Sequence, residues 1–182
     1  MATPIGHALA GYLVFRALAD TKQENRGCLI SICVVMAVSP DLDFLPGIIL
    51  KGQPAFYHQG ISHSLGFAIG VGLMGALVLG RKLRSLPVNW GVFSMAYASH
   101  LVIDLFGPDL RPPFGIPLFW PISENYYIAP FQIFGGVSHA GTTSAPFGEW
   151  MSGVIQPYNL WAIAIEIIVI LPLILIVKRL RA

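Results

Sequence analysis

The sequence predicts an all-α protein: a polytopic helical membrane bundle of about five apolar helices, formed by one integral membrane domain over residues 1–182. Hydrophobic residues make up 55% of the chain and charged residues only 11%, about half the charged share of a soluble domain. Apolar stretches recur along the chain, with small clusters of Lys and Arg between them. A length of 182 residues is typical of one domain.

Five apolar segments are expected to form the helices, at residues 4–19, 28–39, 61–80, 88–106 and 157–177. The last three are long enough to cross a bilayer, which takes roughly 20 apolar residues. The first two are shorter, and two interpretations stay open. They form a partly inserted hairpin, or the second segment continues past Pro40 through the stretch FLPGIIL. Thr3 has the chemistry of an N-cap for the first helix, and Pro4 suits its first turn.

The distribution of positive charge predicts the orientation of the bundle. Every second connection, and the C-terminal tail, carries a cluster of Lys and Arg, made of Lys22, Arg26, Arg81, Lys82, Arg84, Lys178, Arg179 and Arg181. The other connections hold only Lys51 and Arg111. Because positive loops stay in the cytoplasm, we expect the N-terminus outside and the C-terminus in the cytoplasm. The net charge of +2 without a basic face argues against nucleic acid as a partner.

Residues 107–156 form a long connection that is rich in Pro, Gly and aromatic residues. This composition is too stiff and too apolar for a flexible linker. We expect the segment to fold as an extramembrane lid at the outer interface. Trp120, Tyr126 and Tyr127 are its candidate substrate-facing residues, because aromatic side chains prefer the headgroup level of a membrane.

Histidines and aspartates gather at the outer ends of the predicted helices, although they come from four separate places in the chain. They are His7, Asp41, Asp43, His58, His63, His100 and Asp104. Ionisable groups at membrane depth are costly, and they usually mark a functional site. The topology therefore predicts one shared site near the outer membrane face.

The residue types in this set favour a metal site. His100 and Asp104 are four residues apart, so they share one face of a helix and can approach one ion. A simple ion pair between these two side chains is the alternative. Imidazole nitrogen with carboxylate oxygen suits zinc, and also manganese or iron. Asp41 and Asp43 surround a turn next to Pro40, where one carboxylate bridges two ions or each serves its own.

Other polar residues have supporting roles in this interpretation. Ser62 and Ser64 flank His63 and are expected to hydrogen-bond around the ligands. Glu166 lies near the middle of the fifth segment, which offers no second ligand, so we expect it to bond to a neighbouring helix. His139 is expected to have a loop role.

Several motifs occur in a fixed order: HALAG, SPDLDFLPG, HQGISHSLGFA, ASHLVIDLF and PLFWPIS, over residues 4–123. Together they resemble the bacterial LexA-regulated, membrane-bound, metal-dependent hydrolase family. The resemblance implies an inner (plasma) membrane protein, with a hydrolase metal site at the histidines and aspartates named above. A more distant likeness is to zinc-dependent phospholipase C and P1-type nucleases, whose pattern continues with an HxxxE helix. Here Thr143 follows His139 at that spacing, so one or two ions are expected rather than three.

The resulting expectation is a metal-dependent hydrolase that uses metal-activated water at the outer face, with Asp43 or His58 as the general base. Its substrate would be a phosphoester, a lipid or a lipid-linked phosphate, with membrane lipid as the partner. The first alternative is a metal or proton transporter, although transporter sites usually lie near the midplane between inverted repeats. The second is a scaffold in which the metal only holds helices together.

Overall fold

The computed structural model describes residues 1–19, 25–82, 89–109, 112–139 and 144–181. Within these ranges the regular secondary structure is helical, apart from one isolated β-bridge between Ile116 and Tyr127. The all-α prediction is confirmed for this part of the chain. Three of the cations used to predict the orientation, Lys22, Arg84 and Arg111, lie outside the described ranges.

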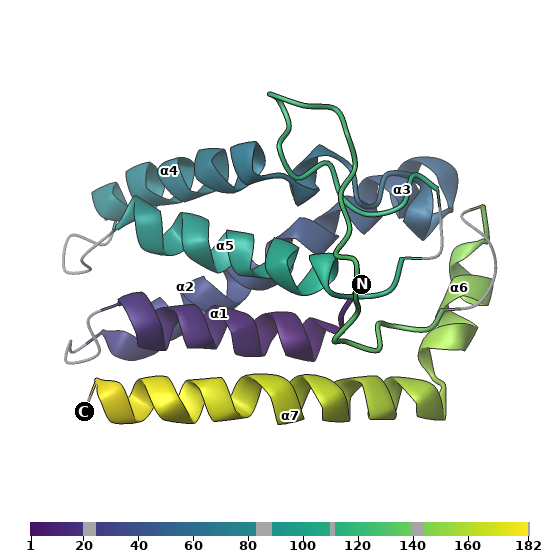
Figure 1. The fold of residues 1–182 in the computed structure, drawn as a ribbon. Helices are drawn as coiled ribbons and strands as arrows, with labels where there is room; N and C mark the ends of the chain where they lie inside the picture. Colours follow the sequence, from purple (N-terminus) through teal and green to yellow (C-terminus); the bar gives the residue numbers. More distant parts are fainter. Residues whose placement is uncertain (20–24, 83–88, 110–111, 140–143, 182) are drawn as a thin grey trace.

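The long helices run alongside one another, so that their ends gather at two opposite ends of the bundle (Figure 1). Helix α5 contacts α1, α2 and α4, and α7 contacts α1. The N-terminus, α3 and α6 lie at one end, and the C-terminus lies at the other (Figure 1). The helices are α1 (Pro4–Leu18), α2 (Arg26–Val38), α3 (Phe44–Lys51), α4 (Leu65–Lys82), α5 (Trp90–Leu105), α6 (Phe147–Val154) and α7 (Pro157–Leu180). The 3-10 turns are η1 (Ser39–Asp43), η2 (Pro54–Phe56) and η3 (Ile61–His63).

Side-chain oxygens cap several helices where the sequence offers a suitable residue. Thr3 Oγ1 accepts a hydrogen bond from the Gly6 amide at 3.3 Å, as expected for the N-cap of α1. Ser64 Oγ accepts from the Phe67 amide at 3.1 Å and starts α4. These caps fix where each helix begins.

The second apolar segment continues past Pro40, which decides between the two interpretations of this region. Helix α2, η1 and α3 follow one another without a break, as one apolar helical unit from Arg26 to Lys51. Proline has no N–H to donate, which explains why the α-helix gives way to the tighter 3-10 turn at Ser39–Asp43. The interruption places two aspartates, Asp41 and Asp43, at the end of the bundle.

Two helical units are long and apolar enough to cross a membrane, Arg26–Lys51 and Pro157–Leu180. The prediction of about five such helices was therefore too high. Helices α1 and α5 have 15 and 16 residues. At 1.5 Å per residue they are about 23 Å long, shorter than a hydrocarbon core of about 30 Å. The apolar part of α4, Leu65–Gly80, is also below this length.

The connection at 107–156 is more structured than a simple loop. It contains α6, and the Leu118 carbonyl accepts a hydrogen bond from the Leu65 amide at 2.9 Å. A Cβ on Gly66 would lie only 2.4 Å from the Trp120 carbonyl oxygen, so this connection packs directly on the start of α4. Its function as a substrate lid stays a prediction.

Close packing of α4 on α5 depends on Gly72. A Cβ at this position would lie 2.7 Å from the Ser94 backbone nitrogen and 2.9 Å from its Cα. We expect Gly72→Ala to destabilise the protein by about 1–3 kcal/mol, because α4 must move away from α5. Gly70→Ala on the same helix is the control, since nothing lies within 4 Å of its added Cβ. Thermal unfolding in detergent measures both, and equal midpoints would contradict this account of the packing.

Candidate metal centre

Buried histidines and aspartates converge where α1 begins, α5 ends and the turns η1 and η3 meet. The side chains of His7, His63, His100 and Asp104 are fully buried, and that of Asp41 is only 15% exposed. The fold thus brings these side chains together, as the sequence predicted. A buried cluster of this kind needs a partner for each polar atom, and its hydrogen bonds show which atoms have one.

The orientation of the His100 ring is set by the backbone of α2. Its Nδ1 lies 2.8 Å from the Ala37 carbonyl oxygen, which accepts a hydrogen bond, so Nδ1 must carry the proton. Nε2 therefore presents its lone pair to the interior of the cluster. It lies 3.1 Å from Asp104 Oδ2 and 3.4 Å from Asp41 Oδ1.

The His63 ring is held in the same way, by a carboxylate. Its Nδ1 lies 3.2 Å from Asp43 Oδ2 and 3.0 Å from Ser62 Oγ. The Asp43 carboxylate accepts from Nδ1, so His63 Nε2 is left with its lone pair facing His100 Nε2 at 3.2 Å. A carboxylate behind a histidine is a common arrangement at metal sites, where it fixes the tautomer and increases the basicity of the ligand.

Four donor atoms form a compact group: His63 Nε2, His100 Nε2, Asp41 Oδ1 and Asp104 Oδ2. Five distances between them are 3.1, 3.2, 3.4, 3.6 and 3.8 Å. Ligands at 2.0–2.1 Å from a tetrahedral zinc ion lie about 3.3 Å from one another. The spacing of these atoms therefore matches the edges of a zinc-sized coordination polyhedron.

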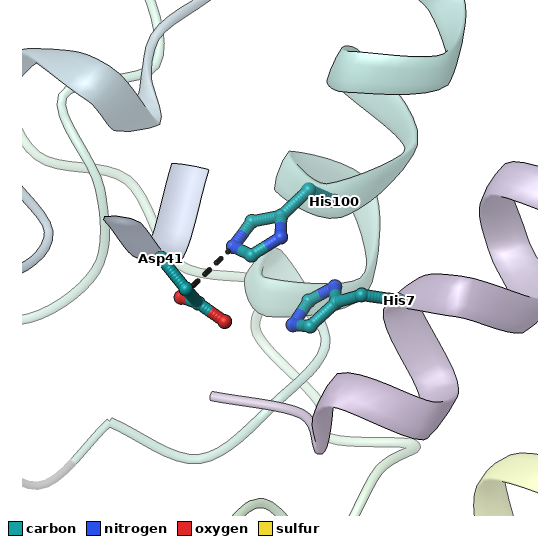
Figure 2. Close-up of side chains that lie close together, drawn as sticks. All are labelled: His7, Asp41 and His100. Carbon is teal, nitrogen blue, oxygen red and sulfur yellow. Dashed lines mark ion pairs between the residues drawn. The ribbon is translucent and has the colours of Figure 1, made fainter. Parts of the chain in front are cut away.

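His7 stacks on His100, with 3.6 Å between the ring centroids and 13° between the ring planes. Figure 2 shows the two rings side by side, next to the Asp41 carboxylate. His7 Nε2 lies 3.5 Å from Asp104 Oδ1 and makes no hydrogen bond. Asp41 Oδ1 and Asp104 Oδ2 are also buried without a hydrogen-bond partner. An ion at this position would satisfy all three of these atoms, so the residues fit a divalent metal.

Asp43 and His58 form a second, adjacent unit. Both Asp43 oxygens are engaged, with His58 Nδ1 at 2.7 Å, Ser62 Oγ at 2.7 Å and the Gln59 amide at 3.1 Å. His58 stacks on Phe44 at 3.8 Å, and its Nε2 contacts the Met1 thioether. Burial lowers the pKa of His58, against the opposing effect of the Asp43 carboxylate. The structure thus places Asp43 behind His63 and His58, rather than at the centre.

Of the remaining predicted residues, some contact the cluster and others lie away from it. Ser62 contacts the His63 ring as expected, whereas Ser64 caps α4 and donates to the Ile61 carbonyl. Tyr126 lines a cavity of about 530 Å³ together with His58, while Trp120 packs beside Gly66. Tyr127 pairs with Ile116. His139 stacks on Trp150, outside the cluster.

The N-terminal segment is a part of the site that the sequence did not indicate. The Ala2 amide donates to Asp104 Oδ1 at 3.1 Å, and the Thr3 amide donates to Glu166 Oε1 at 2.6 Å. Thr3 Oγ1 also donates to Glu166 Oε2. The expected bond from Glu166 to a neighbouring helix is confirmed, and its partner is the start of α1. Backbone amides have no sequence signature, which is why this contact could not be anticipated.

The chain matches the YdjM inner membrane protein family over residues 1–181. It belongs to that family. A similar protein is the inner membrane protein YbcI of Escherichia coli (strain K12), with 27% identity over 176 residues, which covers 88% of this chain and 98% of YbcI. No solved structure matches. The family and the two long apolar helices identify an inner membrane protein, in agreement with the predicted location.

These descriptions name a location and no reaction. Within the YdjM family, the buried cluster of histidines and aspartates is the feature of this chain that bears on its chemistry.

Asp43→Asn tests whether Asp43 positions His63 or binds the ion itself. The amide retains one acceptor oxygen but loses the charge that holds His63 Nδ1–H. We expect metal affinity to fall by about 10–100-fold, the usual effect of removing such an outer partner. Titration with zinc in the presence of a competing chelator measures it. Complete loss of binding would instead make Asp43 a direct ligand.

Proposed function

We propose that this protein is a membrane-embedded, divalent-metal-dependent hydrolase that acts on phosphoesters at the outer membrane face. The observation that carries the proposal is the group of four buried donor atoms at zinc-like spacing, of which Asp41 Oδ1 and Asp104 Oδ2 have no hydrogen-bond partner. Without a metal ion, the buried carboxylates of Asp41 and Asp104 would be balanced only by protonation of His63 and His100, and buried ion pairs of this kind are costly. With a divalent ion their charge is balanced.

The donor set favours one ion. The three groups of residues close enough to share a metal overlap, since His63 occurs in two of them and His100 in two. An imidazole nitrogen has one lone pair and binds one ion, so the groups compete. We assign the ion to His63, His100, Asp41 and Asp104, with His7 as a fifth donor. Zinc fits this mixture of nitrogen and oxygen, and manganese or iron are alternatives.

The chain provides groups for acid–base chemistry beside this centre. When bound, a divalent ion supplies Lewis acidity toward water and toward a phosphoryl oxygen. His58 lines the 530 Å³ cavity, and Asp43 holds its Nδ1–H. Its Nε2 contacts the Met1 thioether, so this nitrogen accepts a proton only once Met1 moves aside. The pair therefore has the arrangement of a histidine base oriented by a carboxylate. We assign proton transfer to His58, and its orientation to Asp43.

We further propose an orientation in which the centre faces outward. Arg26–Lys51 and Pro157–Leu180 would cross the bilayer, with the shorter helices α1, α4 and α5 packed beside them and only partly inserted. The N-terminus would then lie outside and the C-terminus in the cytoplasm, with Lys178, Arg179 and Arg181 at the inner surface.

The function is tested with the purified protein loaded with zinc, manganese or iron(II), using bis(p-nitrophenyl) phosphate as the probe. We expect metal-dependent hydrolysis, reduced by about 10²–10⁴-fold in His58→Gln while the metal content is unchanged. His139→Gln is the matched control, because this histidine lies outside the cluster. No hydrolysis with any of these ions would contradict the proposal. Ion flux across liposomes in that case would support the transporter.

A further inference from the structure

Two cavities adjoin the segment Tyr57–Gly60, and both are lined by Tyr57 and Gly60. The first, of about 530 Å³, is the more polar of the two, because its lining includes His58, Gln53 and Gln59 beside aromatic and proline residues. We call it the polar cavity. The second, of about 420 Å³, is mainly apolar, and its lining includes Pro46, Leu50, Ile61 and Phe67. The two cavities thus share part of their lining.

Exposed apolar side chains border the apolar cavity. Leu50 is 67% exposed and Ile61 is 50% exposed, although both are large hydrophobic side chains. Leu50 belongs to the apolar unit Arg26–Lys51, one of the two candidate membrane spans. Contiguous exposed apolar surface of this kind marks contact with lipid or a partner. In an inner membrane protein, lipid chains have direct access to this cavity.

The apolar cavity also extends to the catalytic residues that we have assigned. Asp43 and Ser62 belong to its lining, and Asp43 bonds directly to His58 and His63. A chain bound in this cavity would therefore end next to the candidate centre.

A positive charge lies near the polar cavity. Lys51 Nζ lies 5.5 Å from the centroid of the Phe56 ring, and Phe56 lines that cavity. Lys51 follows Leu50 in the sequence, so the cation and the apolar cavity are adjacent. Lysine is a common partner of phosphate groups.

We propose that the site takes a membrane phospholipid, with its phosphate headgroup in the polar cavity and one acyl chain in the apolar cavity. This inference rests on the proposed phosphoesterase function and specifies its substrate class. Only an amphiphile occupies both compartments at once. A water-soluble phosphoester would leave the apolar cavity unfilled.

The proposal is tested by photo-crosslinking in liposomes that contain phosphatidylglycerol with a diazirine on its acyl chain. Ile61→Trp is designed to fill the apolar cavity. Ile49→Trp is the matched control, because Ile49 is 76% exposed on α3 and is not part of the lining. We expect labelling of Leu50 and Phe67 to fall at least about fivefold in Ile61→Trp and to stay unchanged in Ile49→Trp, since occlusion of a pocket excludes its ligand. Equal labelling in both variants would mean ordinary contact with surrounding lipid, and would overturn the proposal.

A second measurement separates this inference from the proposed function. We expect the wild type to hydrolyse a long-chain phospholipid at least about tenfold more efficiently than a dibutyryl analogue, because each methylene in an apolar pocket adds selectivity. Ile61→Trp should lose that preference, measured as the ratio of its rates on the two lipids, whatever its absolute activity. Hydrolysis without any chain preference would refute the lipid site alone. Occlusion-sensitive labelling without hydrolysis of any substrate would refute the phosphoesterase alone.

Discussion

Replacing His100 by alanine, or Asp104 by asparagine, should remove the metal from the protein. Each change removes one of four donor atoms, five of whose mutual distances are 3.1–3.8 Å, in a group that is fully buried except for Asp41. We expect affinity for zinc to fall by more than about 100-fold, beyond the 10–100-fold typical of residues that only support a ligand. Elemental analysis of the purified variants, together with chelator competition, measures the loss.

Asp104→Asn is chosen because it keeps an oxygen for the Ala2 amide, which bonds to Asp104 Oδ1 at 3.1 Å. The N-terminal segment should therefore remain in place, and a loss of metal cannot be attributed to its release. His139→Ala serves as the histidine control outside the cluster. If both site variants retained the metal content of the wild type, the four-donor assignment would be wrong.

The second large effect is expected at Glu166, a carboxylate buried in the middle of α7. It accepts hydrogen bonds from the Thr3 amide and hydroxyl, and so ties the start of α1 to α7. Glu166→Ala leaves these two donors buried without a partner, at about 1–3 kcal/mol each. We expect a destabilisation of about 2–6 kcal/mol, with weaker zinc binding because His7 lies one turn further along α1. Urea unfolding in detergent measures the first effect.

A double-mutant cycle with Gly6 isolates this contact. A Cβ on Gly6 would lie 2.6 Å from Glu166 Cδ, so Gly6→Ala should destabilise the wild type. In the Glu166→Ala background, Gly6→Ala should lower the free energy of unfolding much less, because the obstructing side chain is gone. Gly27→Ala is the control, since nothing lies within 4 Å of its added Cβ. Additive effects of the two mutations would show that the Glu166 carboxylate does not pack on α1 as described.

The sequence predicted the structure best where a residue pattern allows only one local arrangement. The four-residue spacing of His100 and Asp104 puts both on one face of α5, and their donor atoms are 3.1 Å apart. Thr3 and Pro4 start α1 where capping preferences predict. The common depth of distant histidines and aspartates followed from the order of helices and charged loops, and the fold brings their side chains together.

Other features depended on geometry that the sequence does not encode. In a 3-10 turn with three residues per turn, positions two apart point in different directions. Asp41 therefore faces His100, while Asp43 faces His58 and the far side of His63. Ala37 and Ala2 bond to the site through a backbone carbonyl and a backbone amide, so their residue types give no sign of these contacts. Composition also overestimated the number of spanning helices, because α1 and α5 are apolar but short.

The most direct test of the account is the metal content of the wild-type protein, purified without chelators and analysed by elemental mass spectrometry and X-ray absorption. We expect about one divalent ion per chain, bound by nitrogen and oxygen donors at about 2.0–2.2 Å, as in zinc sites of histidine and carboxylate. A folded protein that contains no stoichiometric metal, and takes up none when titrated with zinc, manganese or iron(II), would contradict it.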